Sequence, residues 1–284
     1  MIRMPLLPHP TPEELRRDPL PLRGRTALVT GASRRAGIGH AVARRLAAYG
    51  ASVYLHHHVP HDERMPWGAD RPEEVAASVR AALGDPDARV VTGPGDLSDP
   101  AVPAELIATA ASALGGRLDI LVANHALSGS DGTLDTIDAA MLDAHWAIDT
   151  RSVLLLVQAY ARLRAGLPPR TPGGRVMMMT SGQDIAGGMP GEMAYALQKG
   201  ALASITRSLS NTLAEHAVTV NTVNPGPVDT DYMSGEAYDT VAAMFPAGRW
   251  GMPDDPARLL AWLATDEADW VTGQVINSEG GFQR

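Results

Sequence analysis

A tyrosine and a lysine four residues apart carry the clearest chemical signal in this chain. Lys199 is the single lysine among 24 Lys and Arg residues, and it follows Tyr195 at helical i,i+4 spacing. Lys is a compact point charge, whereas Arg is a flat fork that stays protonated. A phenol has a pKa of about 10 and needs a nearby cation to exchange protons near neutral pH. The pair predicts an acid–base site, and the alternative is a lysine at the surface without a role.

The elements that must position this pair are a helix and the strand before it. A helix predicted over 190–216 places Tyr195 and Lys199 near its start, and an apolar stripe continues from them into the core. That stripe consists of Leu202, Ile205 and Leu209. Ser181 directly follows a predicted strand, so we expect its hydroxyl at the carboxyl edge of the sheet, with Thr180 as the second choice.

Strand-like and helix-like stretches alternate from residue 25 onward. The predicted strands are 25–30, 51–57, 89–92, 119–123, 175–180, 218–223 and 274–277. The predicted helices are 38–49, 73–83, 101–114, 138–165, 190–216 and 256–264. This alternation predicts a doubly wound parallel sheet of Rossmann type, an α/β fold in a single domain over 25–284. Ligands of such sheets bind at the carboxyl ends of the strands.

Composition excludes several classes of function. The net charge of −8 argues against a nucleic acid or an anionic membrane as partner. The chain has no cysteine, which excludes disulfides, a thiolate zinc site and a cysteine nucleophile. No apolar run reaches the roughly 18 residues of a membrane helix, and the N-terminus does not resemble a signal peptide. We expect a cytoplasmic protein.

Six prolines in residues 1–24 predict either an extended arm on a neighbouring subunit or a flexible tail.

A glycine-rich turn follows the first predicted strand and leads into a helix. Gly31, Gly37 and Gly39 let the backbone approach a pyrophosphate, whose charge then meets the helix N-terminus. This placement predicts a dinucleotide site, and the alternative is an ordinary tight turn. We expect Ser33 and Ile38 of the same turn to contact the cofactor.

The end of the second predicted strand favours NADP(H) over NAD(H). Sites for NAD usually have an acidic residue there, but this strand ends in three histidines, 56–58, of which we assign His57 to the cofactor site. Arg34 and Arg35 are placed to meet a 2′-phosphate, which an arginine fork suits; the alternative is that both point to solvent. Adjacent strand residues face opposite ways, so the histidines predict no metal site.

The glycine turn and the Ser181, Tyr195 and Lys199 set resemble the short-chain dehydrogenase/reductase family, with its TGxxxGxG turn and its Ser and Tyr-x-x-x-Lys residues. The resemblance implies that Tyr195 exchanges a proton with the substrate oxygen and that Ser181 hydrogen-bonds that oxygen. It implies that Lys199 holds the nicotinamide ribose and lowers the pKa of Tyr195. Two residues are added between Gly31 and Gly37, and the gap from Ser181 to Tyr195 is 14 rather than about 13.

Further matches extend the resemblance over residues 25–282, and it is widest with 3-oxoacyl-carrier-protein-reductase-like members. The segments 224–230, 249–253, 272–274 and 280–282 match family turns. By resemblance, the additional cofactor-binding residues are Asp96, Leu97, Asn124, Pro225, Gly226, Val228 and Thr230.

Two departures from the family pattern concern the catalytic centre. The family's Asn-Asn-Ala-Gly stands here as Ala123-Asn124-His125-Ala126. A catalytic Asn of the family aligns with Asp149, on a predicted stripe with Leu142, Trp146 and Val153. A carboxylate on an apolar stripe needs a partner, and Lys199 is the candidate; the alternative is a shifted alignment with Asp149 at the surface.

These observations predict an NADP(H)-dependent oxidoreductase that interconverts a carbonyl and a secondary alcohol, acting as a homo-oligomer, a tetramer or a dimer. The first alternative is a non-catalytic dinucleotide-binding or regulatory protein. A sugar-nucleotide epimerase or dehydratase is disfavoured because little chain follows the sixth strand.

We expect an apolar substrate pocket between 183–193 and 229–252, although the same side chains could fill the core. Its candidate residues are Met189, Met193, Tyr232, Met233, Met244, Phe245 and Trp250.

Overall fold

Seven parallel strands form the centre of the computed structural model, which describes residues 11, 13, 15–168, 172–185 and 187–283. The strand order is β3-β2-β1-β4-β5-β6-β7. The strands are β1 (Thr26–Val29), β2 (Ser52–His57), β3 (Val90–Pro94), β4 (Ile120–Ala123), β5 (Gly174–Met179), β6 (Val218–Asn224) and β7 (Val275–Asn277). Every residue of β1, β4 and β5 is buried, as expected for parallel strands that are covered on both faces.

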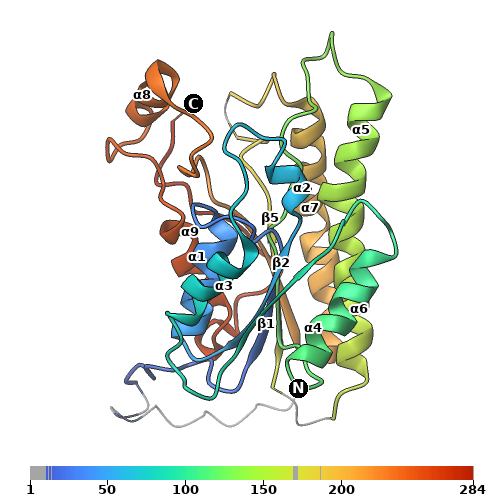
Figure 1. The fold of residues 1–284 in the computed structure, drawn as a ribbon, viewed down its shortest axis with the longest axis vertical. Helices are drawn as coiled ribbons and strands as arrows, with labels where there is room; N and C mark the ends of the chain where they lie inside the picture. The colour runs from blue at the N-terminus through green and yellow to red at the C-terminus, as the bar shows by residue number, and fades with distance from the viewer. Residues whose placement is uncertain (1–10, 12, 14, 169–171, 186, 284) are drawn as a thin grey trace, which may run out of the picture.

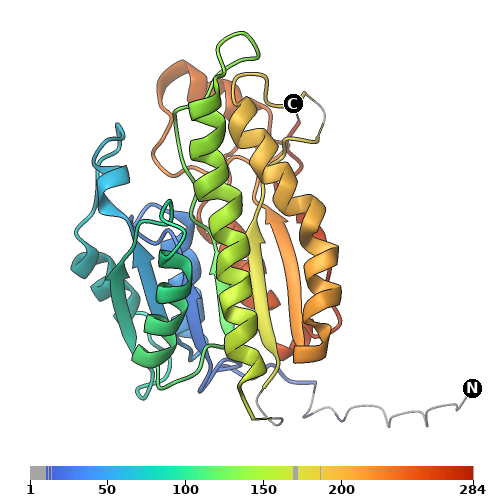
Figure 2. The same cartoon turned by 90° about the vertical axis from the view of Figure 1, so that its right-hand side faces the viewer.

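Helices cover both faces of this sheet (Figure 1). One layer contains α1 (Ile38–Ala48), α3 (Pro72–Arg80) and α9 (Asp254–Leu263). The opposite layer contains α4 (Val102–Ala113), α6 (Ser152–Ala165) and α7 (Met193–Leu213), with α6 and α7 side by side in Figure 2. The predicted doubly wound Rossmann-type fold is confirmed.

Shorter elements lie outside the two layers. They are α2 (Val59–Asp62), α5 (Ala139–His145), a π-helix (Trp146–Arg151), α8 (Gly235–Ala243) and the 3₁₀ turns Ala214–His216 and Asp266–Ala268. The sequence predicted neither α2 nor α8. It also predicted one continuous helix over 138–165, where the structure has α5, the π-helix and α6 in succession.

The direction of the strand order reverses between β1 and β4. Neighbouring connections leave to opposite sides at such a point and open a crevice at the carboxyl ends of the strands. In Figure 1 this is the upper end of the molecule, where α2, α5 and α8 also lie. None of the described helices has both the length and the apolar character needed to cross a bilayer.

Much of the predicted N-terminal arm lies outside the described residues. Within the described part, Leu22 is buried in the core between β2 and α1, and its N–H donates to the carbonyl of Tyr49. The last residues before β1 are therefore attached to this subunit.

Candidate active site

A large cavity opens at the carboxyl ends of the strands. It has a volume of about 1280 Å³ and is bounded by the glycine turn, the segments after β2, β3, β4 and β5, the start of α7 and the loop after β6. The predicted site residues in its wall are Gly31, Ser33, Arg34, Gly37, Ile38, Asp96, Leu97, Asn124, Ser181, Tyr195, Lys199, Pro225, Gly226, Val228 and Thr230. The described residues of that wall do not include Arg35, Gly39, His57 or Asp149.

The turn after β1 requires glycine at two positions. Gly31 has a φ of +67°, and a Cβ on it would lie 2.7 Å from the backbone Cα of His125. A Cβ on Gly39 would lie 2.7 Å from Nδ2 of Asn124, which donates hydrogen bonds to the carbonyls of Thr30 and Gly31. This close approach leaves the N-terminus of α1 at the cavity, where backbone N–H groups favour an anion.

Asp131 fixes the start of α7. Its carboxylate accepts hydrogen bonds of 2.8 Å from the backbone N–H groups of Ala194 and of Tyr195. Such N–H groups at a helix N-terminus have no partner within the helix. Burial acts to raise the pKa of Asp131, but the bonds from Tyr195 and Ala194 outweigh it and lower that pKa. An ionised Asp131 therefore anchors the residue that carries the phenol.

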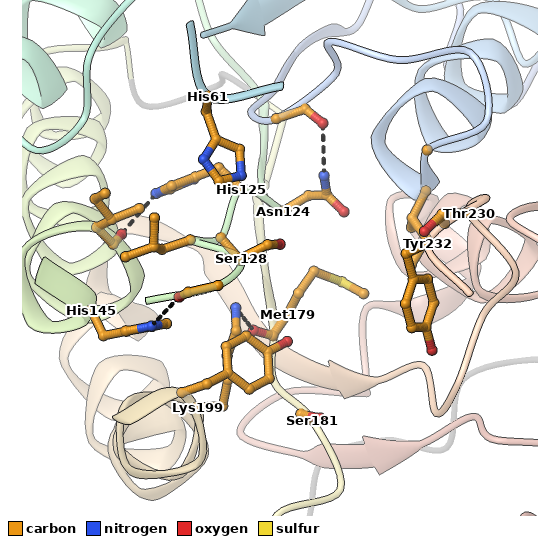
Figure 3. Close-up of a pocket in the computed structure, with 18 of the residues that line it drawn as sticks. His61, Asn124, His125, Ser128, His145, Met179, Ser181, Lys199, Thr230 and Tyr232 are labelled. Atoms are coloured by element: carbon orange, nitrogen blue, oxygen red, sulfur yellow. Dashed lines mark hydrogen bonds between the residues drawn. The ribbon is translucent and has the colours of Figure 1, made fainter. Parts of the chain in front are cut away.

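Tyr195 and Lys199 share one face of α7, as their spacing predicted. The ammonium Nζ of Lys199 lies 5.4 Å from the centroid of the Tyr195 ring. It donates a hydrogen bond of 3.1 Å to the carbonyl of Met179 at the end of β5, which Figure 3 shows as a dashed line. The Lys199 side chain is buried, so this cation is held beside the phenol rather than in solvent.

Two hydroxyls follow β5, and they have different surroundings. Thr180 donates a hydrogen bond of 2.7 Å to the carbonyl of Lys199, which ties the end of β5 to α7. Ser181 lines the cavity, where its hydroxyl lies 3.7 Å from Sδ of Met189. Both residues line the cavity, but the hydroxyl of Thr180 is engaged by the carbonyl of Lys199.

The pKa of Tyr195 is raised above its ordinary value, whereas the sequence led us to expect a lowered one. Burial is the largest cause, followed by the negative charges of Asp149 and Glu192, while Ser181 acts in the opposite direction. Burial lowers the pKa of Lys199, which the charge of Asp149 partly offsets. The phenol is thus protonated at neutral pH and can serve as a proton donor.

Asp149 is completely buried, which excludes the alternative that it lies at the surface. Its hydrogen-bonding partners differ from the expected Lys199. Oδ1 accepts from the backbone N–H of Leu127 at 2.7 Å, and Oδ2 pairs with Nδ1 of His145 at 2.7 Å. The π-helix accounts for this arrangement because its wider turn shifts the register after α5. The expected stripe is broken accordingly, since Trp146 is 45% exposed.

Comparison with known proteins identifies the family of this chain. Residues 31–283 match a family described as Enoyl-(Acyl carrier protein) reductase. An uncharacterized oxidoreductase of Bacillus subtilis, YjdA, is 42% identical over 260 residues, covering 91% of this chain and 96% of its own. The chain belongs to the short-chain dehydrogenase/reductase family. Members of this family are oxidoreductases that bind a nicotinamide dinucleotide and act on small molecules.

Solved structures agree with this assignment. A doubly substituted variant of a Serratia marcescens short-chain dehydrogenase/reductase has a TM-score of 0.80 at 33% identity, covering 93% of this chain and 100% of that one. A blue fluorescent protein from a metagenomic library, solved in complex with NADPH, has a TM-score of 0.77 at 30% identity, covering 93% of this chain and 99% of that one.

His125, which departs from the family pattern, is an uncharged side chain that links neighbouring segments by hydrogen bonds. Its Nδ1 lies 2.7 Å from Oγ1 of Thr30, and its Nε2 lies 2.7 Å from Oγ of Ser152 and 3.1 Å from the carbonyl of Ile148. Burial, with the charges of His56 and Lys199, holds the pKa of His125 well below its ordinary value. The uncharged ring therefore ties the ends of β1 and β4 to the π-helix.

The two arginines of this family member's extended glycine turn have separate roles. Arg34 lines the cavity, lies 5.1 Å over the ring of Trp67 and donates to the carbonyl of Thr230 at 3.0 Å. Arg35 is half exposed and pairs with Asp70, whose hydrogen bond is the main cause of the raised pKa of Arg35. Only Arg34 of the pair faces the cavity.

The strand period explains the placement of the histidines after β2. His56 and His58 line the cavity, whereas the intervening His57 points to the other face. Nδ1 of His56 accepts from the N–H of Gly31 at 3.3 Å, and Nε2 donates to the carbonyl of Gly95 at 3.0 Å. Burial lowers the pKa of His56 to about 4. Both ring nitrogens of His56 are thus engaged within the protein.

The predicted substrate pocket divides into a wall and a core. Met189, Tyr232 and Met233 line the cavity. Trp250 is instead buried and stacks on Tyr238 of α8, with ring centroids 4.9 Å apart. Phe245 is likewise buried, with its ring centroid 6.4 Å from that of Trp250. The alternative of core filling therefore holds for part of this segment.

Three residues of this site were missed by the sequence reasoning: Asp131, His145 and Trp67. His145 precedes Asp149 at i,i+4 spacing on a predicted helix, so a search for the carboxylate's partner could have found it. Asp131 and Trp67 lie in loops, where sequence spacing predicts no contact.

Proposed function

We propose that this chain is an NADP(H)-dependent oxidoreductase that interconverts a carbonyl compound and a secondary alcohol, with Tyr195 as the general acid and base. The observation that carries the proposal is the meeting of Ser181, Tyr195 and Lys199 at one cavity with the glycine turn. Family membership supports the class of reaction, and the NADPH complex of one structural neighbour supports the cofactor.

The residues around the glycine turn fit a dinucleotide. The turn has no room for side chains at Gly31 and Gly39, and it presents the start of α1 to a pyrophosphate. Asp96 and Asn124 would bound the adenine and central parts, and Arg34 would meet a 2′-phosphate. When bound, the nicotinamide ring supplies or accepts the hydride.

The catalytic side chains divide the remaining work in carbonyl reduction. Ser181 hydrogen-bonds the carbonyl oxygen and fixes its position beside the phenol. Tyr195 donates its proton to that oxygen as negative charge develops there. The ammonium of Lys199 stabilises the phenolate that remains and orients the ribose of the cofactor.

The raised pKa of Tyr195 gives a direction to the pH dependence. Reduction needs the protonated phenol, so its rate should persist to alkaline pH and fall as the pH rises through the pKa of Tyr195. Alcohol oxidation needs the phenolate, so its rate should rise over the same interval. Initial rates in both directions over a pH series test this prediction. A reduction rate that already falls as the pH rises from acid to neutral would contradict it.

Cofactor preference should depend on Arg34 and not on Arg35. Arg34→Ala should weaken NADPH binding about tenfold to a hundredfold and NADH binding much less, because it removes charge-assisted contacts to the 2′-phosphate. Arg35→Ala is the matched control and should change neither, because Arg35 pairs with Asp70. Fluorescence titration of each cofactor measures both constants. Equal losses of NADPH and NADH affinity in Arg34→Ala would refute the assignment.

Turnover separates this proposal from that of a non-catalytic dinucleotide-binding protein. The cavity wall beside Tyr195 carries Met189, Tyr232 and Met233, so bulky apolar ketones and aldehydes are the substrates to test first. We expect NADPH consumption with members of such a panel. Tight NADPH binding without consumption by any carbonyl compound would favour the non-catalytic alternative.

We also propose a homo-oligomer in the cytoplasm. Trp146, Leu154 and Leu197 are exposed by 45%, 38% and 61% on the face formed by the π-helix, α6 and α7, which supports a second copy as the cover. The absence of cysteine supports a reducing compartment. Light scattering of the purified protein tests the oligomeric state, and a monomer at micromolar concentration would refute it.

A further inference from the structure

The π-helix beside the active site holds a buried pair of titratable side chains. His145 is the last residue of α5 and Asp149 lies one helical turn later; their side chains are 1% and 0% exposed. Nδ1 of His145 lies 2.7 Å from Oδ2 of Asp149. Figure 3 labels His145 and draws the contact of its other ring nitrogen with the carbonyl of Gly129. A buried pair of this kind is costly to form and strongly disturbed when one partner is removed.

The contacts define the protonation state of His145. Nε2 faces the carbonyl of Gly129 at 3.0 Å, with Oδ2 of Asp131 at 3.9 Å, and Nδ1 faces the carboxylate of Asp149. All of these partners accept hydrogen bonds, so both ring nitrogens must donate, and only the imidazolium has two N–H groups. Oδ1 of Asp149 accepts from the N–H of Leu127 at 2.7 Å.

This pair lies against the catalytic residues of α7. The rings of His145 and Tyr195 meet edge to face with centroids 6.3 Å apart. The charge of Asp149 acts on both Tyr195 and Lys199, where it opposes ionisation of the phenol and favours the ammonium. An uncompensated Asp149 would therefore counteract the cation on which proton transfer depends.

We propose that His145 is a positioning residue of the active site: as an imidazolium it neutralises Asp149, so that the charge of Lys199 acts on the phenol of Tyr195. This inference rests on the proposed function, since it concerns the same proton transfer.

Other charged and titratable groups face the same centre from every neighbouring element. They are Asp131 from the loop before α5, Glu192 and Tyr232 beside Tyr195, His61 of α2 near Asp149, and His125 near Lys199. Burial acts to lower the pKa of His145, but the hydrogen bond with Asp149 and its charge outweigh this and raise that pKa. The pair is intact below that pKa and loses its cation as the pH rises through it.

Three variants separate this role from a packing role. At neutral pH His145→Gln leaves the charge of Asp149 uncompensated and should lower kcat for carbonyl reduction about tenfold, because the phenolate that forms is less stabilised. This deficit should shrink as the pH rises through the pKa of His145, where the wild type also loses the cation. Asp149→Asn removes the carboxylate and should not lower the rate, and the double variant H145Q/D149N should return the rate to that of D149N alone, because no charge then remains to be neutralised. His216→Gln, in the 3₁₀ turn after α7, is the matched control and should leave the rate unchanged.

The inference is overturned by a double variant no faster than H145Q, or by an H145Q enzyme as fast as the wild type at neutral pH. One measurement without turnover keeps this test independent of the proposed function and of variants that fold poorly. Nuclear magnetic resonance of the wild-type protein should show both N–H groups of His145 at neutral pH, and a ring with one N–H would overturn the inference. Absence of turnover in the wild type would count against the proposed function alone.

Discussion

Tyr195→Phe should lower kcat for carbonyl reduction by about 10²- to 10⁴-fold while NADPH affinity changes by no more than a few-fold. The substitution removes the phenol oxygen and keeps the ring that packs against His145. The proton donor is lost, whereas the cavity wall and the glycine turn are unchanged. Steady-state rates and cofactor titration on the same preparation measure both quantities.

Ser181→Ala is the companion variant for this prediction. It should also lower kcat, but the phenol stays in place, so its pH profile should keep a limb that the Tyr195→Phe profile lacks. A Tyr195→Phe enzyme that reduces carbonyl compounds at a rate near that of the wild type would show that another group donates the proton.

Lys199→Arg should lower kcat by about a hundredfold or more although the charge is kept. The ammonium occupies a buried site between the Tyr195 ring and the carbonyl of Met179, and it donates one bond of 3.1 Å there. A planar guanidinium is larger and directs its donors in a fixed fork, so it cannot hold the same position.

The matched control is Arg207→Lys, an exposed position on the same helix. It introduces a second lysine into α7 and should leave the rate unchanged. A Lys199→Arg enzyme with a normal kcat would mean that any cation suffices, and the significance of the single lysine would be lost.

The sequence predicted the sheet and the helix that carries Tyr195 and Lys199 because both depend on local periodicity. The seven strands are short apolar runs separated by helical segments, and the structure pairs all of them in parallel. Tyr195 and Lys199 share a face because i,i+4 spacing alone places them there. Ser181 is at the cavity because it lies just beyond the carboxyl end of β5.

The π-helix could not be predicted in this way. Periodicity over 138–165 indicates a helix but does not reveal an inserted residue that changes the register. Trp146 is consequently exposed rather than part of the expected stripe, and Asp149 reaches His145 and Leu127. Tertiary packing determines the long-range partners of a buried carboxylate, and spacing along the sequence does not predict them.

The assignment of cofactor contacts had a similar limit. Arg34 and Arg35 are neighbours with the same side chain, yet one faces the cavity and the other pairs with Asp70 from the loop before α3. That loop is connected to β2 through the short α2, and its path depends on contacts such as that of Trp67 with Arg34. His57 illustrates a simpler case, since strand alternation itself places His56 and His58 at the cavity instead.

The most direct test of the central claim uses NADPH that carries deuterium at the transferable position of the nicotinamide ring. The enzyme is incubated with an apolar ketone, and the alcohol product is analysed by mass spectrometry. Our account predicts one deuterium at the carbinol carbon, with a single stereochemistry, and far slower formation of that product by Tyr195→Phe. An alcohol without deuterium, or bound NADPH that never transfers its label to any carbonyl compound, would contradict the account.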